Sequence, residues 1–201
     1  MLSLFLAIGF LSCKTSEKEM DKLEIAKQYY KALDDSETSL IPTLLKDSIV
    51  IRESEYDYQE TFSAKGYATW LQWDSVFDPT YKILEMEQEG EIVKATISKM
   101  DKRILFLHEV PIVSKEVLHF DKNKISKVEK IEYPVFNDSI FVKNRDEFLS
   151  WMNANHPDLN DFINDQTKAG GIKYLKAIDL YNNRKYGSPT ISNIKIYDFC
   201  P

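Results

Sequence analysis

A change of hydrophobic period at Thr80 constrains the fold more than any other feature of the sequence. From this residue on, apolar side chains come in short runs separated by polar turns, a pattern that predicts successive β-strands. Connections this short require antiparallel neighbours, because a parallel pair needs a crossover of about a dozen residues or more. We therefore expect an antiparallel meander of five strands. These strands cover residues 81–88, 92–99, 103–110, 114–121 and 125–133.

The residues before the meander have a mainly helical pattern. Apolar side chains spaced three and four apart predict helices here. Pro42 suits the first turn of one helix, and Ser63 suits the N-cap of another. A short apolar run between them predicts a single strand. The expected elements are helices over residues 22–35, 39–46 and 63–77 and a strand over residues 48–54.

The chain becomes helical again after the meander. Asn144 suits the N-cap of one helix, and Pro157 suits the first turn of the next. Gly170-Gly171 predicts a break before a last helix over residues 172–183. A short strand is expected over residues 194–197.

The predicted strand over residues 103–110 is apolar on both faces, so both faces should be covered. The N-terminal helices can cover one of them. The other requires either the C-terminal helices or a second copy of the chain in a homodimer. We expect the last helix to cover the outer face of the sheet through a stripe of Ile172, Leu175 and Ile178.

The order of these elements resembles the nuclear transport factor 2-like superfamily, which includes the SnoaL-like polyketide cyclases and the ketosteroid isomerases. The resemblance covers residues 22–134. It is carried by the opening helix, by the passage from the second helix into the first strand, and by the two closing strands. The matching segments are residues 25–33, 44–50, 117–121 and 124–129.

The resemblance implies an α+β fold in which three N-terminal helices pack against a curved antiparallel sheet. Together they form a cone with one open end, through which ligands enter. Residues 135–201 lie outside the resemblance and are expected to form a helical extension packed on the same domain. A likeness in fold specifies no chemistry, so we carry over no catalytic residue from these enzymes.

Asp74 is the first candidate for a functional residue. It falls on the apolar side of the predicted third helix, beside Trp70 and Trp73. Burial there would raise the pKa of its carboxyl group and suit it to general acid or base catalysis. The alternatives are a position at the rim of the cone or a pair with a lysine.

His108 is the second candidate for acid or base catalysis, with the alternative that it is a core histidine whose ring nitrogens are satisfied. It shares a face of its predicted strand with Phe106. His119 is expected at the surface or the rim. Tyr29 or Tyr30 should line the cone, either donating to a ligand oxygen or bonding a backbone carbonyl. The expected ligand-binding residues are Tyr30, Trp70, Trp73 and Phe106.

The composition disfavours several classes of partner. The net charge is −6 with no basic cluster, which argues against nucleic acid and against binding to anionic lipid headgroups. The chain has three histidines, none closely spaced, and neither cysteine has a ligand-type neighbour, so we expect no metal site. We expect no cofactor.

The N-terminal segment predicts a location. Residues 1–12 form an apolar run that is too short to span a hydrocarbon core of about 30 Å, and Cys13 ends it at a charged segment. This pattern is typical of a secretory signal and resembles the lipobox of bacterial lipoproteins, in which the cysteine receives a diacylglycerol. The alternatives are a simple cleaved signal and a buried N-terminal strand. Residues 13–21 would then form a tether.

The sequence therefore predicts a lipid-anchored domain of the bacterial cell envelope. Lys14 follows the cysteine, which by resemblance to lipoprotein sorting favours the outer membrane. The first functional hypothesis is a non-catalytic domain whose cone binds a small, mostly apolar ligand. The second is a module that interacts with an envelope protein. The third is an isomerase, dehydratase or cyclase that uses Asp74 and His108.

Overall fold

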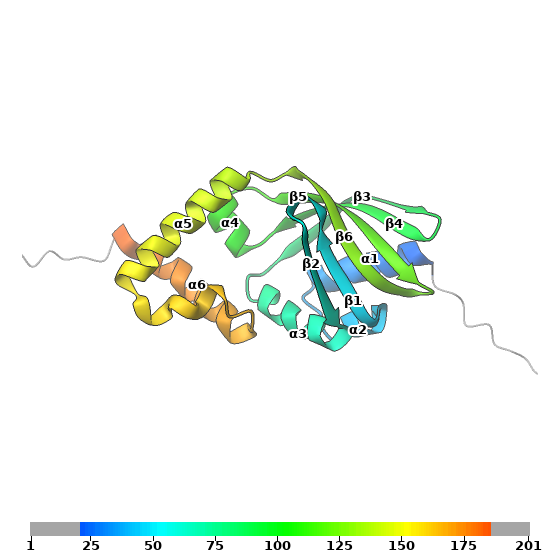
Figure 1. Cartoon of the computed structure of the whole chain (residues 1–201), viewed down its shortest axis with the longest axis horizontal. Coiled ribbons are helices and arrows are strands. Elements are labelled where there is room, and N and C mark those ends of the chain that lie inside the picture. The colour runs from blue at the N-terminus through cyan, green and yellow to red at the C-terminus, as the bar shows by residue number, and fades with distance from the viewer. Residues whose placement is uncertain (1–20, 186–201) are drawn as a thin grey trace, which may run out of the picture.

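The computed structural model describes residues 21–185 (Figure 1). The N-terminal segment with Cys13 and the strand predicted over residues 194–197 lie outside them. The elements are α1 (Lys22–Asp34), α2 (Ile41–Leu44), β1 (Leu45–Glu53), η1 (Ser54–Tyr56), β2 (Tyr58–Ser63), α3 (Ala64–Ser75), β3 (Thr80–Glu89), β4 (Ile92–Met100), α4 (Lys102–His108), β5 (Ile112–Asp121), β6 (Lys124–Val135), α5 (Asp138–Asn155), η2 (Pro157–Ile163), α6 (Lys168–Asn182) and η3 (Asn183–Lys185).

The described strands form one six-stranded sheet in the order β2-β1-β6-β5-β4-β3. The predicted meander is present as β3, β4, β5 and β6, which pair antiparallel in succession. The sheet as a whole is mixed, because β1 runs parallel to β6. The antiparallel expectation was therefore wrong at this one pairing, where about seventy residues of intervening chain supply the crossover that a parallel pair needs. Strand β2 was not predicted, because its mostly exposed residues show no apolar alternation.

Helix α4 and its C-terminal end occupy residues 103–110, so the third predicted meander strand was wrong. The Asp101 carboxylate caps this helix by accepting a hydrogen bond from the Ile104 N–H at 2.6 Å. Glu109 ends it in the left-handed conformation, with φ at 68°. Ile104 and Leu107 are buried while Leu105 is exposed, which is helical spacing. A continuous apolar run does not by itself distinguish a buried strand from a helix.

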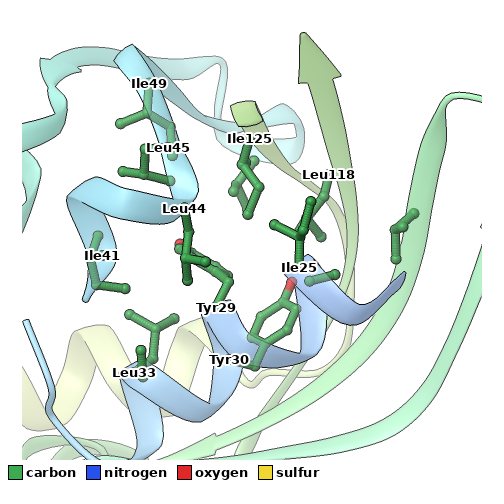
Figure 2. Packing of buried hydrophobic residues seen from close by; sticks show 14 of the residues in the cluster. Ile25, Tyr29, Tyr30, Leu33, Ile41, Leu44, Leu45, Ile49, Leu118 and Ile125 are labelled. Atoms are coloured by element: carbon green, nitrogen blue, oxygen red, sulfur yellow. The ribbon is translucent and has the colours of Figure 1, made fainter. Parts of the chain in front are cut away.

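The first hydrophobic core lies between α1 and the sheet. Asp21 caps α1, and the buried side chains of Ile25 and Tyr29 stand one helical turn apart on the same face. Figure 2 shows side chains from α1, α2, β1, β5 and β6 converging here, among them Leu44, Leu118 and Ile125. Each fully buried aliphatic side chain of this kind contributes about 1.5–3 kcal/mol relative to exposure. This core fixes α1 against the sheet.

A second core joins the C-terminal helices to α3 and α4. Its fully buried centre is Phe148 of α5, whose ring centroid lies 5.0 Å from that of Phe106 and 5.5 Å from that of Phe162. Trp73 and Phe77, from α3 and the residues after it, complete this core. In Figure 1, α5 and α6 accordingly lie beside α3 and α4, at one end of the sheet.

The C-terminal helix was therefore wrongly expected on the outer face of the sheet. Ile172 is 56% exposed, whereas Ile178 is buried in the second core. The other face of residues 104–107 is covered by α5, through Phe106. The outer face of the sheet carries ion pairs instead, such as Lys115 with Glu132.

Two further boundaries differ from prediction. Helix α5 begins at Asp138 because the side chain of Asn137 caps it, and Asn144 lies inside the helix, where it donates to the Leu107 carbonyl at 2.9 Å. Gly170 and Gly171 do not break a helix but form the first turn of α6. A Cβ atom at Gly170 would lie 1.8 Å from a backbone oxygen, so close packing requires glycine there.

Replacement of Phe148 by alanine tests the second core. We expect Phe148→Ala to lower the free energy of unfolding by about 3–5 kcal/mol, because it leaves a cavity among aromatic rings. The control, Ile172→Ala, should change it by less than about 0.5 kcal/mol, since this side chain is exposed. Urea unfolding measures both values. A larger loss for Ile172→Ala than for Phe148→Ala would contradict the packing described here.

Candidate ligand-binding cavity

A cavity of about 480 Å³ lies between the inner face of the sheet and helices α1, α3, α4 and α5. This volume suits a small organic ligand. Tyr56 of η1 and Tyr58 of β2 line the cavity and are each 46% exposed, which places its mouth at these elements. The cone that the sequence predicts is therefore open among the described residues.

One wall of the cavity is aromatic. Tyr67, Trp70 and Trp73 follow each other at three-residue spacing on α3, so all three point to the same side of the helix. The rings of Tyr67 and Trp70 are nearly parallel at 5.8 Å between centroids, and Trp73 follows at 5.9 Å from Trp70. The indole N–H of Trp70 donates to the Gln166 side-chain oxygen at 3.0 Å, which fixes the ring. The result is an aromatic wall that faces the ligand space.

Asp74 also lines the cavity, but its carboxylate is paired with a lysine. The Lys99 ammonium of β4 donates to it at 2.6 Å and the Tyr81 hydroxyl donates to it at 3.0 Å. Burial is the largest single influence on the Asp74 carboxyl and would raise its pKa. The charge and hydrogen bond of Lys99, with the Arg103 charge and the Tyr81 hydrogen bond, together outweigh burial and lower the pKa. The expected raised pKa was therefore wrong, and the alternative of a lysine pair describes this residue. An ionised carboxylate held in this way is a weak proton acceptor.

A second ion pair also lines the cavity. The Lys130 ammonium of β6 lies 3.0 Å from a carboxylate oxygen of Glu53 of β1. Burial raises the pKa of the Glu53 carboxyl, but the charge and hydrogen bond of Lys130, with smaller contributions from Tyr133 and Arg103, together outweigh burial and lower the pKa. For Lys130, burial lowers the pKa of the ammonium, and Glu53, Tyr133 and Glu116 together raise it further than burial lowers it. Both groups are therefore charged at neutral pH.

Glu116 is a cavity residue that sequence reasoning missed, as it missed the charged groups of the two ion pairs other than Asp74. Its buried carboxylate accepts hydrogen bonds from the Tyr30 hydroxyl at 2.8 Å and from the Ser114 hydroxyl at 2.7 Å. Within residues 21–185, no cation lies within ion-pair distance of it. It can therefore accept a further hydrogen bond, or a proton, from a bound molecule. Glu116 lies opposite Lys130 in the register of β5 and β6, and the sequence alone does not reveal this register.

The two tyrosines of α1 both line the cavity. Tyr30 donates to Glu116, and the hydroxyl of Tyr29 lies 2.8 Å from that of Tyr67. Burial raises the pKa of both phenols well above the usual value, so both remain protonated at neutral pH. Their hydroxyl groups bond side chains, not the backbone carbonyls that the alternative prediction named.

His108 and Phe106 lie outside the cavity lining. The His108 ring donates from Nδ1 to the Val110 carbonyl at 2.8 Å and accepts from the Asn137 N–H at Nε2, 2.7 Å away. Both ring nitrogens are thus occupied, as expected for a core histidine, and the ring is neutral. Phe106 packs on Phe148 because α4 turns it away from the cone. The structure therefore does not bring His108 and Asp74 into one catalytic site.

Other expectations concern the outer surface and metals. His119 lies on the outer face of the sheet, with Nε2 at 3.4 Å from a Glu129 carboxylate oxygen. No group of three or more histidine, cysteine, aspartate or glutamate side chains within residues 21–185 could hold a metal ion. Over the same residues, no helix has the length and apolar character to cross a bilayer.

Comparison with known proteins gives likenesses in structure only. No family model and no curated protein matches the chain. A crystal structure of a candidate polyketide cyclase from Acidithiobacillus ferrooxidans matches with a TM-score of 0.50 and 13% identity, over 63% of this chain and 96% of that one. A candidate ketosteroid isomerase from Kribbella flavida has a TM-score of 0.49 and 13% identity, over 58% and 80% of the two chains.

A third structure, of an NTF2-like protein of unknown function from Cytophaga hutchinsonii, has a TM-score of 0.46 and 11% identity, over 58% and 93% of the chains. At such identities a likeness shows the fold alone, so the activities named for these proteins stay with them. The α+β class and the resemblance stated from the sequence are confirmed. The chain is thus similar in fold to the polyketide cyclase structure, and this similarity assigns it no activity.

Proposed function

We propose that this chain is a binding domain whose cone holds a small organic molecule with a flat apolar body and polar groups. The observation that carries the proposal is the open cavity of about 480 Å³, with an aromatic wall on one side and buried polar groups on the other. A flat ligand body can stack on the Tyr67 and Trp70 rings. The free acceptor capacity of Glu116 favours a ligand that also donates a hydrogen bond.

The charged lining refines the ligand class expected from the sequence. Two ion pairs and Glu116 face the ligand space, and buried polar groups lose stability when they lack partners. A wholly apolar ligand would leave these groups without partners, so the ligand is amphipathic. Its apolar part lies on α3 and its polar groups face the sheet.

A binding role has better support than the alternatives. The enzyme hypothesis required Asp74 and His108 in one cavity, and His108 lies outside the lining. The interaction-module hypothesis is favoured by a filled cone, whereas an open cavity favours a ligand. Neither alternative has an observation of its own in its favour.

The proposed location is the cell envelope, with Cys13 lipidated after removal of residues 1–12. Support comes from the sequence alone: the apolar run ends at Cys13, and a polar segment follows it. Residues 13–21 act as the tether to the domain. Two acyl chains contribute about 0.8 kcal/mol per buried methylene and anchor a domain stably. Lys14 directs the lipoprotein to the outer membrane.

Replacement of Cys13 by serine tests the anchor. In a bacterial host the full chain should incorporate labelled palmitate and sediment with membranes, and Cys13→Ser should do neither. Cys200→Ser is the matched control, because it removes the other cysteine of the chain and should leave the labelling unchanged. An unlabelled wild-type chain, or labelling that survives in Cys13→Ser, would refute the anchor.

Partial filling of the cone tests the binding site. We expect 2-naphthamide, a flat neutral probe, to bind with one site per chain in a calorimetric titration. Ile51→Trp places a larger side chain at the cavity lining and should weaken binding at least about tenfold. Ile83→Trp makes the same change at an exposed position of β3 and should leave affinity unchanged. Equal affinities of the two variants would place the binding site elsewhere.

A further inference from the structure

Arg103 lies at the cavity wall with a hydrogen-bond donor left unpaired among the described residues. Its guanidinium carbon lies 4.8 Å from the ring centroid of Trp73 and 5.5 Å from that of Phe77, so two aromatic rings hold it in place. Its Nη2 atom is 3.6 Å from the Asp101 carboxylate, beyond hydrogen-bond distance. Its Nε atom is buried and lacks a hydrogen-bond partner within residues 21–185. A rigidly held guanidinium thus keeps its donors available beside the ligand space.

The groups around Arg103 also supply more donors than acceptors. Lys99 lines the cavity and makes one hydrogen bond, to Asp74, while the Asp101 oxygen near it is 3.7 Å away. The other Asp101 oxygen is committed to the cap of α4, while the near one is a buried acceptor without a hydrogen-bond partner among the described residues. The indole N–H of Trp73 is buried with no partner among the described residues. Unmade hydrogen bonds of buried donors are costly, so this end of the cavity favours a ligand that brings acceptor atoms.

A third cation, Arg145, lines the same end of the cavity from α5. Burial raises the pKa of the Tyr174 phenol to about 12, and the charges of both Arg103 and Arg145 oppose the rise. The charges of both guanidinium groups therefore reach the buried Tyr174 side chain. Arg145 also bonds Asp146, and both side chains are exposed enough, at 39% and 59%, for solvent to screen their charges.

The shape of the guanidinium, not a surplus of charge, indicates which group fits. Lys99 and Arg103 face the buried carboxylates of Asp74 and Asp101, and Arg145 is paired with Asp146, so these charges balance. A planar carboxylate matches the planar fork of a guanidinium, and such pairs form short, charge-assisted hydrogen bonds.

We propose that the end of the cavity between α3, α4 and α5 binds a carboxylate of the ligand through Arg103, while the flat body of the ligand stacks on α3. The ligand is then a flat aromatic or multi-ring carboxylic acid. This inference rests on the proposed binding function and names its ligand class. Arg103 sets the specificity for charge, and the aromatic wall supplies affinity that is independent of charge.

Two probes with one ring system separate these contributions. 2-Naphthoate and 2-naphthamide have the same size and differ in charge at neutral pH. The wild-type chain should bind the carboxylate at least about tenfold more tightly than the amide in calorimetric titrations. Arg103→Gln should remove this preference, because it weakens binding of the carboxylate at least about tenfold and binding of the amide by much less. Arg103→Lys keeps the charge without the planar fork and should retain only part of the preference.

Each outcome decides one of the two proposals. Equal binding of both probes by the wild-type chain, or an undiminished preference in Arg103→Gln, would overturn the carboxylate site and leave the binding function in place. Failure of the amide to bind the wild-type chain would overturn the binding function, and the carboxylate site with it. If thermal melting shows that Arg103→Gln does not fold, Arg103→Lys decides, and a full wild-type preference in that variant contradicts the proposal.

Discussion

The packing of α3 between two hydrophobic cores is the interaction on which the rest of the structure depends. Tyr67 and Trp70 face the cone, while Trp73 and Phe77 continue the same aromatic row into the core formed by α5, η2 and α6. The helical spacing of these residues makes one element serve both sides. The C-terminal helices therefore hold the wall of the cavity in place, and they supply the Phe148 ring at the centre of the second core.

Charged groups inside the cone are the second constraint. Asp74 with Lys99 and Glu53 with Lys130 are held inside a fold beside two hydrophobic cores. Desolvation of such pairs offsets much of their attraction, so they contribute little net stability. Their positions around one cavity are more readily understood as features of a binding site. The polar lining thus separates this cone from a simple apolar pocket.

Much of the fold could be predicted from the sequence. Helices α1 and α3 and strands β3 to β6 have clear periodicity and recognisable caps, such as Ser63, so their positions were close to those observed. Helix α4 was missed because its apolar run fits both periods, and the Asp101 cap was not recognised. Glycines 170 and 171 were taken for a break because their close contacts arise only in the folded chain.

The candidate site was predictable only in part. Tyr30, Trp70, Trp73 and Asp74 were placed in the cone from helix faces, and the structure puts them in the cavity lining. The partners that set their chemistry come from other strands and helices. Lys99, for example, reverses the expected pKa shift of Asp74, and its position follows from a register that no local pattern encodes.

The most direct measurement is a crystal structure of the chain grown with 2-naphthoate. The account predicts ring density against Tyr67 and Trp70, with the carboxylate within hydrogen-bond distance of the Arg103 guanidinium. A cavity closed by the side chains of α3 and α5, or a ligand bound only outside the cone, would contradict it.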